Sequence, residues 1–284
     1  MTELKSILLH LDAAANTNAR LQLAMRLARA HGARVDALYA VLPVVLQYPF
    51  AFSGDAPGAA LLMNYEAEQC ERIKAAFEYG RQRTGAADAP PVTWHESSDD
   101  PVRAFTQLAW AADLMLLAQH DPAPNAYSGV APDFAASVLV ASGKPGLVMP
   151  FIGAGDKLGE TVLIAWKPSP EAARAVTAAL PLLQRARRVH LALWDDAQTP
   201  ASAEPQPIER YLANHGITPT LHRDALTGPE AHRVGELLLS LAADVQADLL
   251  VMGCYSHGRA REWVLGGATR TILQSMTLPV LMVH

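Results

Sequence analysis

The sequence repeats its own pattern of secondary-structure elements. In each half, short apolar runs of strand length alternate with stretches that carry helix signals. The runs of the first half are 7–11, 35–42, 114–118 and 147–149, and those of the second half are 162–166, 189–194, 249–252 and 280–283. Because the runs are apolar on both faces, they are typical of buried parallel strands. This alternation predicts an α/β protein with open parallel sheets covered by helices on both faces.

Two pairs of segments make the duplication visible. AADLMLLAQHD corresponds to QADLLVMGCYS, and GKPGLVMP corresponds to TLPVLMVH. We therefore predict two domains, residues 1–152 and 158–284, joined by the glycine-rich segment PFIGAGDKLGE. The opening strands of the halves are further apart than the later pairs, which places an insertion at about residues 44–64 of the first domain.

Residues that typically start or end helices occur between the predicted strands. The run 169–171, Ser-Pro-Glu, offers an N-cap oxygen, a proline at the first helical position and an acid against the helix dipole. A second helix should open at 131–133 and end at Gly143, because Pro145 follows that glycine. Pro181 should kink or shorten the helix that begins near Ser169.

Composition narrows the class of protein. Half of the residues are hydrophobic and 18% are charged, so the chain can bury a core. A net charge of -5 does not favour nucleic acid or an anionic membrane as a partner. The two cysteines and the absence of a signal-peptide pattern predict a reducing cytoplasm, and no apolar run approaches the ~20 residues of a transmembrane helix.

Candidate ligand residues stand where strands end, at the edge where open α/β sheets bind ligands. Asp12 ends the first strand, and its carboxylate suits a ribose or adenine edge; it equally suits a polar loop or a helix cap. Gly253 ends a strand of the second half, and its loop leads to a helix near Gly266 or Gly267. Such a loop can hold an anion on backbone N–H groups, or it can be a plain strand-to-helix turn.

Other motif searches find no catalytic or metal site. SGKP lacks the glycine spacing of a P-loop, and HESSD lacks the second histidine of a zinc protease helix. There is no G-x-S-x-G segment, and the two cysteines are too distant for a thiolate metal site. We therefore do not expect a dedicated enzyme.

At this point the sequence resembles the universal stress protein family, in a tandem form with two such domains. The carriers are SILLHLD, NARLQLAMRLARAHGARV, ADLLVMGCYSHGRAREWVLGGATRTIL and TLPVLMVH. The resemblance implies two flavodoxin-like or Rossmann-like domains of the adenine nucleotide alpha-hydrolase type, each with a five-stranded parallel sheet. It also implies pairing through the last strands and, in some members, an ATP or AMP site with Mg²⁺.

The resemblance assigns the nucleotide contacts to a set of loop residues and two strand ends. They are Gly253, Ser256, His257, Gly258, Gly266, Gly267 and Ala268, with Asp12 and Trp166 as further candidates. Nucleotide-binding members show G-x2-G-x9-G-[ST] after the fourth strand and an acid after the first. Here Ser256 replaces the second glycine and Gly267 replaces the Ser/Thr. Asp12 also belongs to a different domain from the glycine loop, because Trp166 and Lys167 replace the acid in the second domain.

Three functions follow from this pattern. The first is a cytoplasmic stress-response or regulatory module with weak ATP or AMP binding in the second domain. The second is slow ATP hydrolysis at that loop, with Ser256 and His257 near the γ-phosphate. The third is a scaffold without a small ligand, in which the strands at 147–149 and 280–283 pair the two domains as an intramolecular pseudo-dimer or pair two chains as a homodimer.

Overall fold

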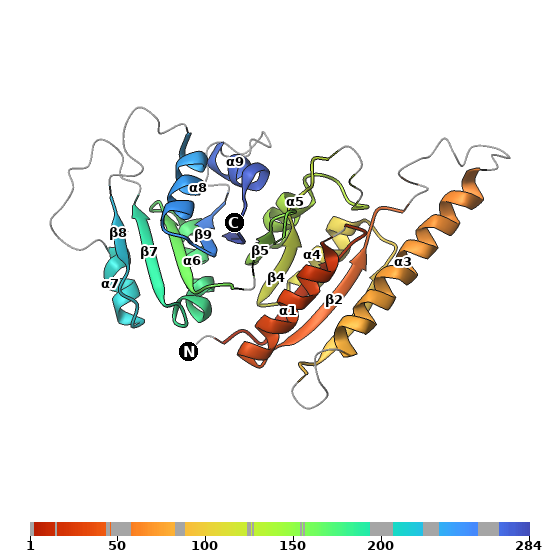
Figure 1. Ribbon diagram of the computed structural model, residues 1–284, viewed down its shortest axis with the longest axis horizontal. Helices are drawn as coiled ribbons and strands as arrows, with labels where there is room; N and C mark the ends of the chain where they lie inside the picture. Colours follow the sequence, from red (N-terminus) through yellow and green to blue (C-terminus); the bar gives the residue numbers. More distant parts are fainter. Residues whose placement is uncertain are drawn as a thin grey trace. The chain divides into compact units, whose positions relative to one another are not determined.

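The chain forms two compact units in the structure, a computed structural model. We call residues 4–144 the N-terminal unit and residues 145–284 the C-terminal unit. The structure describes residues 3–14, 16–43, 46, 58–82, 89–123, 126, 128–153, 155, 157–193, 207–223, 233–254 and 267–284. Strands and helices alternate along both units (Figure 1).

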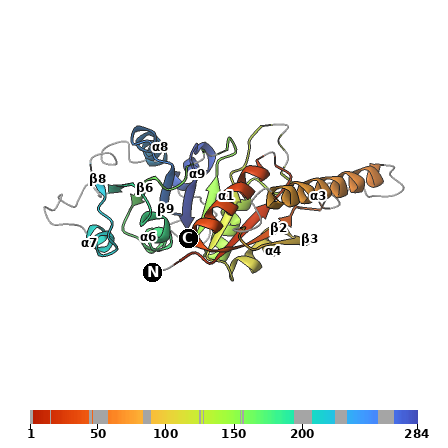
Figure 2. The same ribbon diagram turned by 60° about the horizontal axis from the view of Figure 1, so that its bottom comes forward.

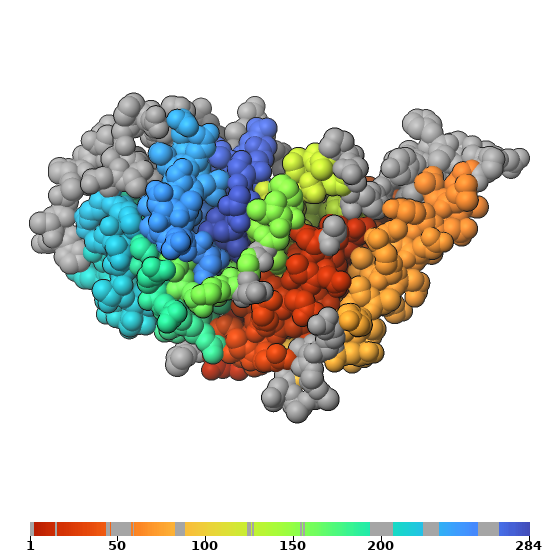
Figure 3. Space-filling view, viewed as in Figure 1, coloured from red at the N-terminus to blue at the C-terminus, as the bar shows by residue number. Residues whose placement is uncertain are grey.

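The described residues of the N-terminal unit form four parallel strands in the order β3-β2-β1-β4. They are β1 (Ser6–Leu11), β2 (Arg34–Ala40), β3 (Val92–Ser97) and β4 (Leu114–Ala118). The helices are α1 (Thr17–His31), α3 (Gly58–Gln82), α4 (Pro101–Ala109) and α5 (Phe134–Ser142). Helices α1 and α4 lie on opposite faces of the strands (Figure 2), and α1 lies beside α3 (Figure 3).

The C-terminal unit contains six strands in the order β5-β10-β9-β6-β7-β8. They are β5 (Gly146–Met149), β6 (Thr161–Trp166), β7 (Arg188–Leu193), β8 (Thr220–His222), β9 (Leu249–Gly253) and β10 (Val280–Val283). The helices are α6 (Pro170–Leu183), α7 (Pro207–Asn214), α8 (Val234–Asp244) and α9 (Gly267–Ser275). The strands β6 to β10 are parallel, and β5 runs antiparallel to β10.

The predicted α/β class and its apolar strands are confirmed. All eight apolar runs form strands whose ends lie within two residues of the prediction. The strands β3 and β8 were not among these runs, because they lie at sheet edges and consist of exposed and half-buried residues with no fully buried one. Of the insertion predicted at 44–64, residues 58–64 form the first turns of α3, and all but one of the others lie outside the described residues.

The predicted helix signals are also confirmed. The Ser169 hydroxyl caps α6 by accepting from the Ala172 N–H at 3.2 Å, with Pro170 at the first helical position. Pro181 lies in the last turn of α6, which ends two residues later. Helix α5 ends at Gly143, whose φ of 60° is the left-handed conformation that favours glycine.

An aspartate holds the start of β1 in one unit and the start of β6 in the other. Asp113, just before β4, accepts from the backbone N–H groups of Lys5 and Ser6 at 2.8 and 3.0 Å. Asp248, just before β9, accepts from those of residues 159–161 at 2.7 to 3.2 Å. The same clamp at the same place supports the duplication that the sequence pattern predicts.

The core of each unit lies between its strands and helices. Leu8 and Leu9 of β1 point to opposite faces and are at most 1% exposed, and the adjacent Leu163 and Ile164 of β6 are fully buried. Apolar residues that point to both faces of a strand require helices on both sides of the sheet. No helix in the described part of the chain is long and apolar enough to cross a membrane.

Candidate functional site

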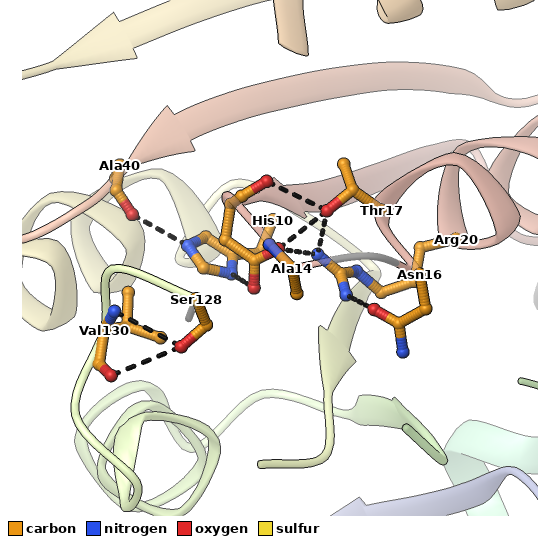
Figure 4. A network of polar contacts seen from close by, with 9 residues as sticks. His10, Ala14, Asn16, Thr17, Arg20, Ala40, Ser128 and Val130 are labelled. Carbon is orange, nitrogen blue, oxygen red and sulfur yellow. Dashed lines mark hydrogen bonds and ion pairs between the residues drawn. The ribbon is translucent and has the colours of Figure 1, made fainter. Parts of the chain in front are cut away.

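Asp12 lies at the carboxyl end of β1, as predicted, and is fully buried. Its Oδ1 accepts from the Ala14 N–H at 3.1 Å and from the Thr17 hydroxyl at 2.7 Å. The same oxygen pairs with the guanidinium of Arg20, which is also fully buried on α1. Figure 4 shows Thr17 and Arg20 converging on this point. The carboxylate is therefore engaged by its own unit.

His10 completes this buried polar cluster. Its Nε2 bonds the carbonyl of Ala40 at 2.9 Å, and its Nδ1 lies 3.7 Å from Asp12 Oδ2. The ring packs against Phe134 with centroids 4.3 Å apart and the ring planes tilted by 32°. Burial lowers the pKa of His10 to about 4, so the imidazole is neutral near neutral pH.

The ionisation of Asp12 follows from the same contacts. Burial works to raise the pKa of this carboxyl group, but Arg20, His10 and Thr17 together hold it below its ordinary value. The folded N-terminal unit therefore keeps a carboxylate and a guanidinium paired out of water. Breaking such a buried pair is costly, because one charge remains without its partner.

The segment that follows β4 closes the carboxyl ends of β1 and β2. The Ala13 N–H donates to the carbonyl of Ser128 at 3.1 Å, and the Leu42 N–H donates to that of Gly129 at 2.6 Å. Ser128 stands close to the cluster in Figure 4. A ligand approaching Asp12 would have to displace Arg20 or this segment.

Sequence reasoning missed Arg20. It lies eight residues from Asp12 and was quoted only as part of a helix. A signal was present, since Arg20, Ala24 and Leu27 share one helical face, and both neighbours are buried. An arginine on an apolar face needs a buried counter-charge, and Asp12 is the acid at the adjoining strand end.

Gly253 is the last residue of β9 and packs against the first turn of α6. A Cβ atom at this position would lie 2.5 Å from the backbone nitrogen of Ala172 and 2.7 Å from the carbonyl carbon of Glu171. No side chain fits at that distance, so packing alone requires this glycine. Its presence is therefore explained without a ligand, as the plain strand-to-helix interpretation expects.

The other end of the predicted loop has different surroundings. Gly267 opens α9, as predicted, is exposed, and has no atom within 4 Å of a would-be Cβ. Ala268 follows it and is half-buried. Trp166 ends β6 and is also half-buried. The remaining candidates of the loop, Ser256, His257, Gly258 and Gly266, lie outside the described residues.

Charged groups surround the end of β9. Glu171 is buried in the first turn of α6, and Arg174 donates to it at 3.3 Å and to the carbonyl of His284 at 3.0 Å. His284 in turn lies 3.4 Å from the carbonyl of Cys254. Burial and the Glu171 carboxylate raise the pKa of the Cys254 thiol, so it is protonated and unreactive.

No group of three or more His, Cys, Asp or Glu side chains suited to a metal ion occurs among the described residues.

The fold defines a class of protein: an α/β chain in which one order of strands and helices occurs twice. Residues 160–284 match the model of the Universal stress protein family. This part of the chain is a universal stress protein domain, which confirms the resemblance seen in the sequence. Residues 6–149, from β1 to β5, lie outside the matched residues and repeat the order of strands and helices seen from β6 to β10.

Two solved structures with TM-scores above 0.5 share the fold. A universal stress protein from Archaeoglobus fulgidus DSM 4304 aligns over 98% of this chain and 97% of its own, with 16% identity and a TM-score of 0.68. A putative universal stress protein from Pseudomonas aeruginosa UCBPP-PA14 aligns over 99% and 93%, with 14% identity and a TM-score of 0.54. A universal stress protein in complex with cAMP aligns over 53% and 99%, with 17% identity and a TM-score of 0.31. No curated protein matches the sequence at a significant level.

Proposed function

We propose that this protein is a cytoplasmic stress-response regulator whose C-terminal unit binds an adenine nucleotide, ATP or AMP with Mg²⁺, at the carboxyl edge of β6 and β9. The observation that carries the proposal is the family match of residues 160–284, which contains the whole segment from Gly253 to Gly267. This segment follows a parallel strand and ends at a helix, the context in which backbone N–H groups hold phosphate.

The contrast between the units supports placing the ligand in the C-terminal one. In the N-terminal unit, Arg20 and the segment 128–130 occupy the edge beside Asp12. In the C-terminal unit, the start of α9 is exposed at Gly267. The N-terminus of α9 carries a partial positive charge that favours an anion.

The test uses a charge placed at Gly267 that does not disturb the fold. A Cβ atom at this position meets no atom within 4 Å, and aspartate suits the first turn of a helix. The full chain is titrated calorimetrically with ATP, AMP and cAMP in the presence of Mg²⁺. We expect saturable binding by the wild type, and Gly267→Asp should weaken it at least fivefold, because a like charge within about 4 Å of a phosphate costs roughly 1–4 kcal/mol.

The matched control is Gly267→Asn, which has the same shape without the charge and should bind nearly as the wild type does. Gly253→Val is unsuitable as a control, because its side chain would collide with α6 and unfold the unit. Absence of binding at millimolar nucleotide, or equal binding by the Asp and Asn variants, would contradict the proposal. Absence of binding would favour the ligand-free scaffold.

A further inference from the structure

Two histidines face each other on neighbouring strands of the C-terminal unit. His190 of β7 and His222 of β8 have their Nδ1 and Nε2 atoms 2.9 Å apart, and their ring centroids are separated by 5.2 Å. Both side chains are half-buried, and β8 is the edge strand of its unit. The pair lies outside the proposed nucleotide site and takes no part in it.

The N-terminal unit has a different pair of side chains at the equivalent positions, and that pair is a plain structural contact. Its strand register puts Asp36 and His95 at the positions of His190 and His222. There the His95 Nε2 donates to the Asp36 carboxylate at 3.0 Å, which is a complete donor and acceptor pair. The C-terminal unit has replaced the acid with a second imidazole.

The surroundings of the two pairs are otherwise alike. An arginine stands two residues earlier on the strand, Arg34 in one unit and Arg188 in the other. Arg34 donates to the Asp36 carboxylate at 3.1 Å, whereas Arg188 donates to the hydroxyl of Thr161 at 3.3 Å. The histidine pair is therefore left without a neutralising carboxylate among these contacts.

We propose that His190 and His222 form a two-ligand site for a divalent transition metal ion of the Cu²⁺, Ni²⁺ or Zn²⁺ class. Imidazole nitrogens are ligands that all three ions accept. Two nitrogens bound at right angles, each about 2.0–2.1 Å from one ion, lie about 2.9 Å apart, and tetrahedral ligation needs about 3.3 Å. The observed separation of 2.9 Å is that of the hydrogen bond, and both nitrogens reach one Cu²⁺ ion at right angles once the rings turn their lone pairs toward it, with water in the remaining positions.

The hydrogen bond between the two rings holds a proton that must move before both nitrogens can bind one ion. The two rings share one N–H proton in their hydrogen bond. When the ion binds, this proton moves to the far nitrogen of its own ring, and the charge of the pair does not change. When His190 is the donor, the receiving atom is its far Nε2, which is buried without a hydrogen-bond partner among the described residues.

The experiment titrates the full chain with Cu²⁺, because this ion heads the affinity order of the divalent first-row metals. Calorimetry is run on the wild type, His222→Gln and the matched control His95→Gln, which removes the histidine at the equivalent place in the other unit. We expect one tight Cu²⁺ in the wild type and the control. His222→Gln should lose roughly 100-fold in affinity, because joining two ligands gains at least about that factor over one.

Two further measurements keep the outcome decisive. Electron paramagnetic resonance should show coupling to two nitrogens in wild type and to fewer in His222→Gln. Circular dichroism establishes that each variant is folded. The variant His190→Gln, which removes the histidine on β7, should lose Cu²⁺ affinity in the same titration. Equal affinity in wild type and His222→Gln, or equal losses in His222→Gln and His95→Gln, would overturn the proposal.

Discussion

Gly253 and Gly267 stand at the two ends of the loop that the sequence singles out, and their surroundings differ. At Gly253 the backbone of α6 comes within 2.5 Å of a would-be Cβ, whereas at Gly267 the space is open. The first glycine is required by packing, and the second is required by nothing in the described structure. Packing therefore explains the glycine at 253 but not the glycine at 267.

This difference predicts opposite effects of alanine. Gly253→Ala should lower the free energy of unfolding by about 1–3 kcal/mol, because the methyl group forces α6 to shift. Gly267→Ala should leave stability unchanged or raise it by up to about 1 kcal/mol, because alanine restricts the unfolded chain. Urea unfolding followed by circular dichroism compares the two. Similar unfolding midpoints for both variants would show that the contact of Gly253 with α6 is wrong.

His10 gives the N-terminal unit a pH dependence. Its pKa is about 4 in the folded protein and 6.5 when unperturbed, so between these values the unfolded chain binds more protons. Stability should therefore fall as the pH falls from 6.5 to 4, by at most about 3 kcal/mol. His10→Gln should flatten this part of the profile, and His95→Gln should not. Urea midpoints measured across that pH range decide the matter, and a slope unchanged in His10→Gln would refute the assignment.

At the scale of elements, the sequence predicts what local physics controls. The central strands were found because they are apolar on both faces, and α6 was found because Ser169 and Pro170 mark its start. The edge strands β3 and β8 were missed because none of their residues is fully buried and they lack continuous apolar runs.

Contacts between elements could not be predicted in the same way. The pair of His190 and His222 depends on the register of β7 and β8, 32 residues apart. The closed edge beside Asp12 depends on where the segment 128–130 returns. The local sequence pattern predicts neither the histidine pair nor the position of this segment, because tertiary packing sets both.

The contribution of Asp113 and Asp248 to stability can be measured separately in each unit. Asp248→Ala should lower the stability of the C-terminal unit by about 1–3 kcal/mol, because it leaves the N–H groups of residues 159–161 without their acceptor. Asp113→Ala should cost the N-terminal unit less, since it holds two N–H groups at an exposed position. Scanning calorimetry measures both losses. A larger loss for Asp113→Ala than for Asp248→Ala would contradict this account.

At the scale of the whole molecule, the two units share one architecture and differ at the edge where ligands bind. The N-terminal unit fills this edge with its own Arg20 and the segment 128–130. The C-terminal unit has a glycine, Gly267, at the exposed start of α9. Residues 160–284 of this unit match the family model. We therefore expect the duplicated chain to have divided its roles, with structure in one unit and nucleotide binding in the other.

Hydrogen–deuterium exchange of the full chain with and without Mg²⁺-ATP tests this division most directly. The account predicts slower exchange at the end of β9 and the start of α9, and unchanged exchange across β1 and the start of α1. Slower exchange around Asp12 instead, or no change anywhere at saturating ATP, would contradict it.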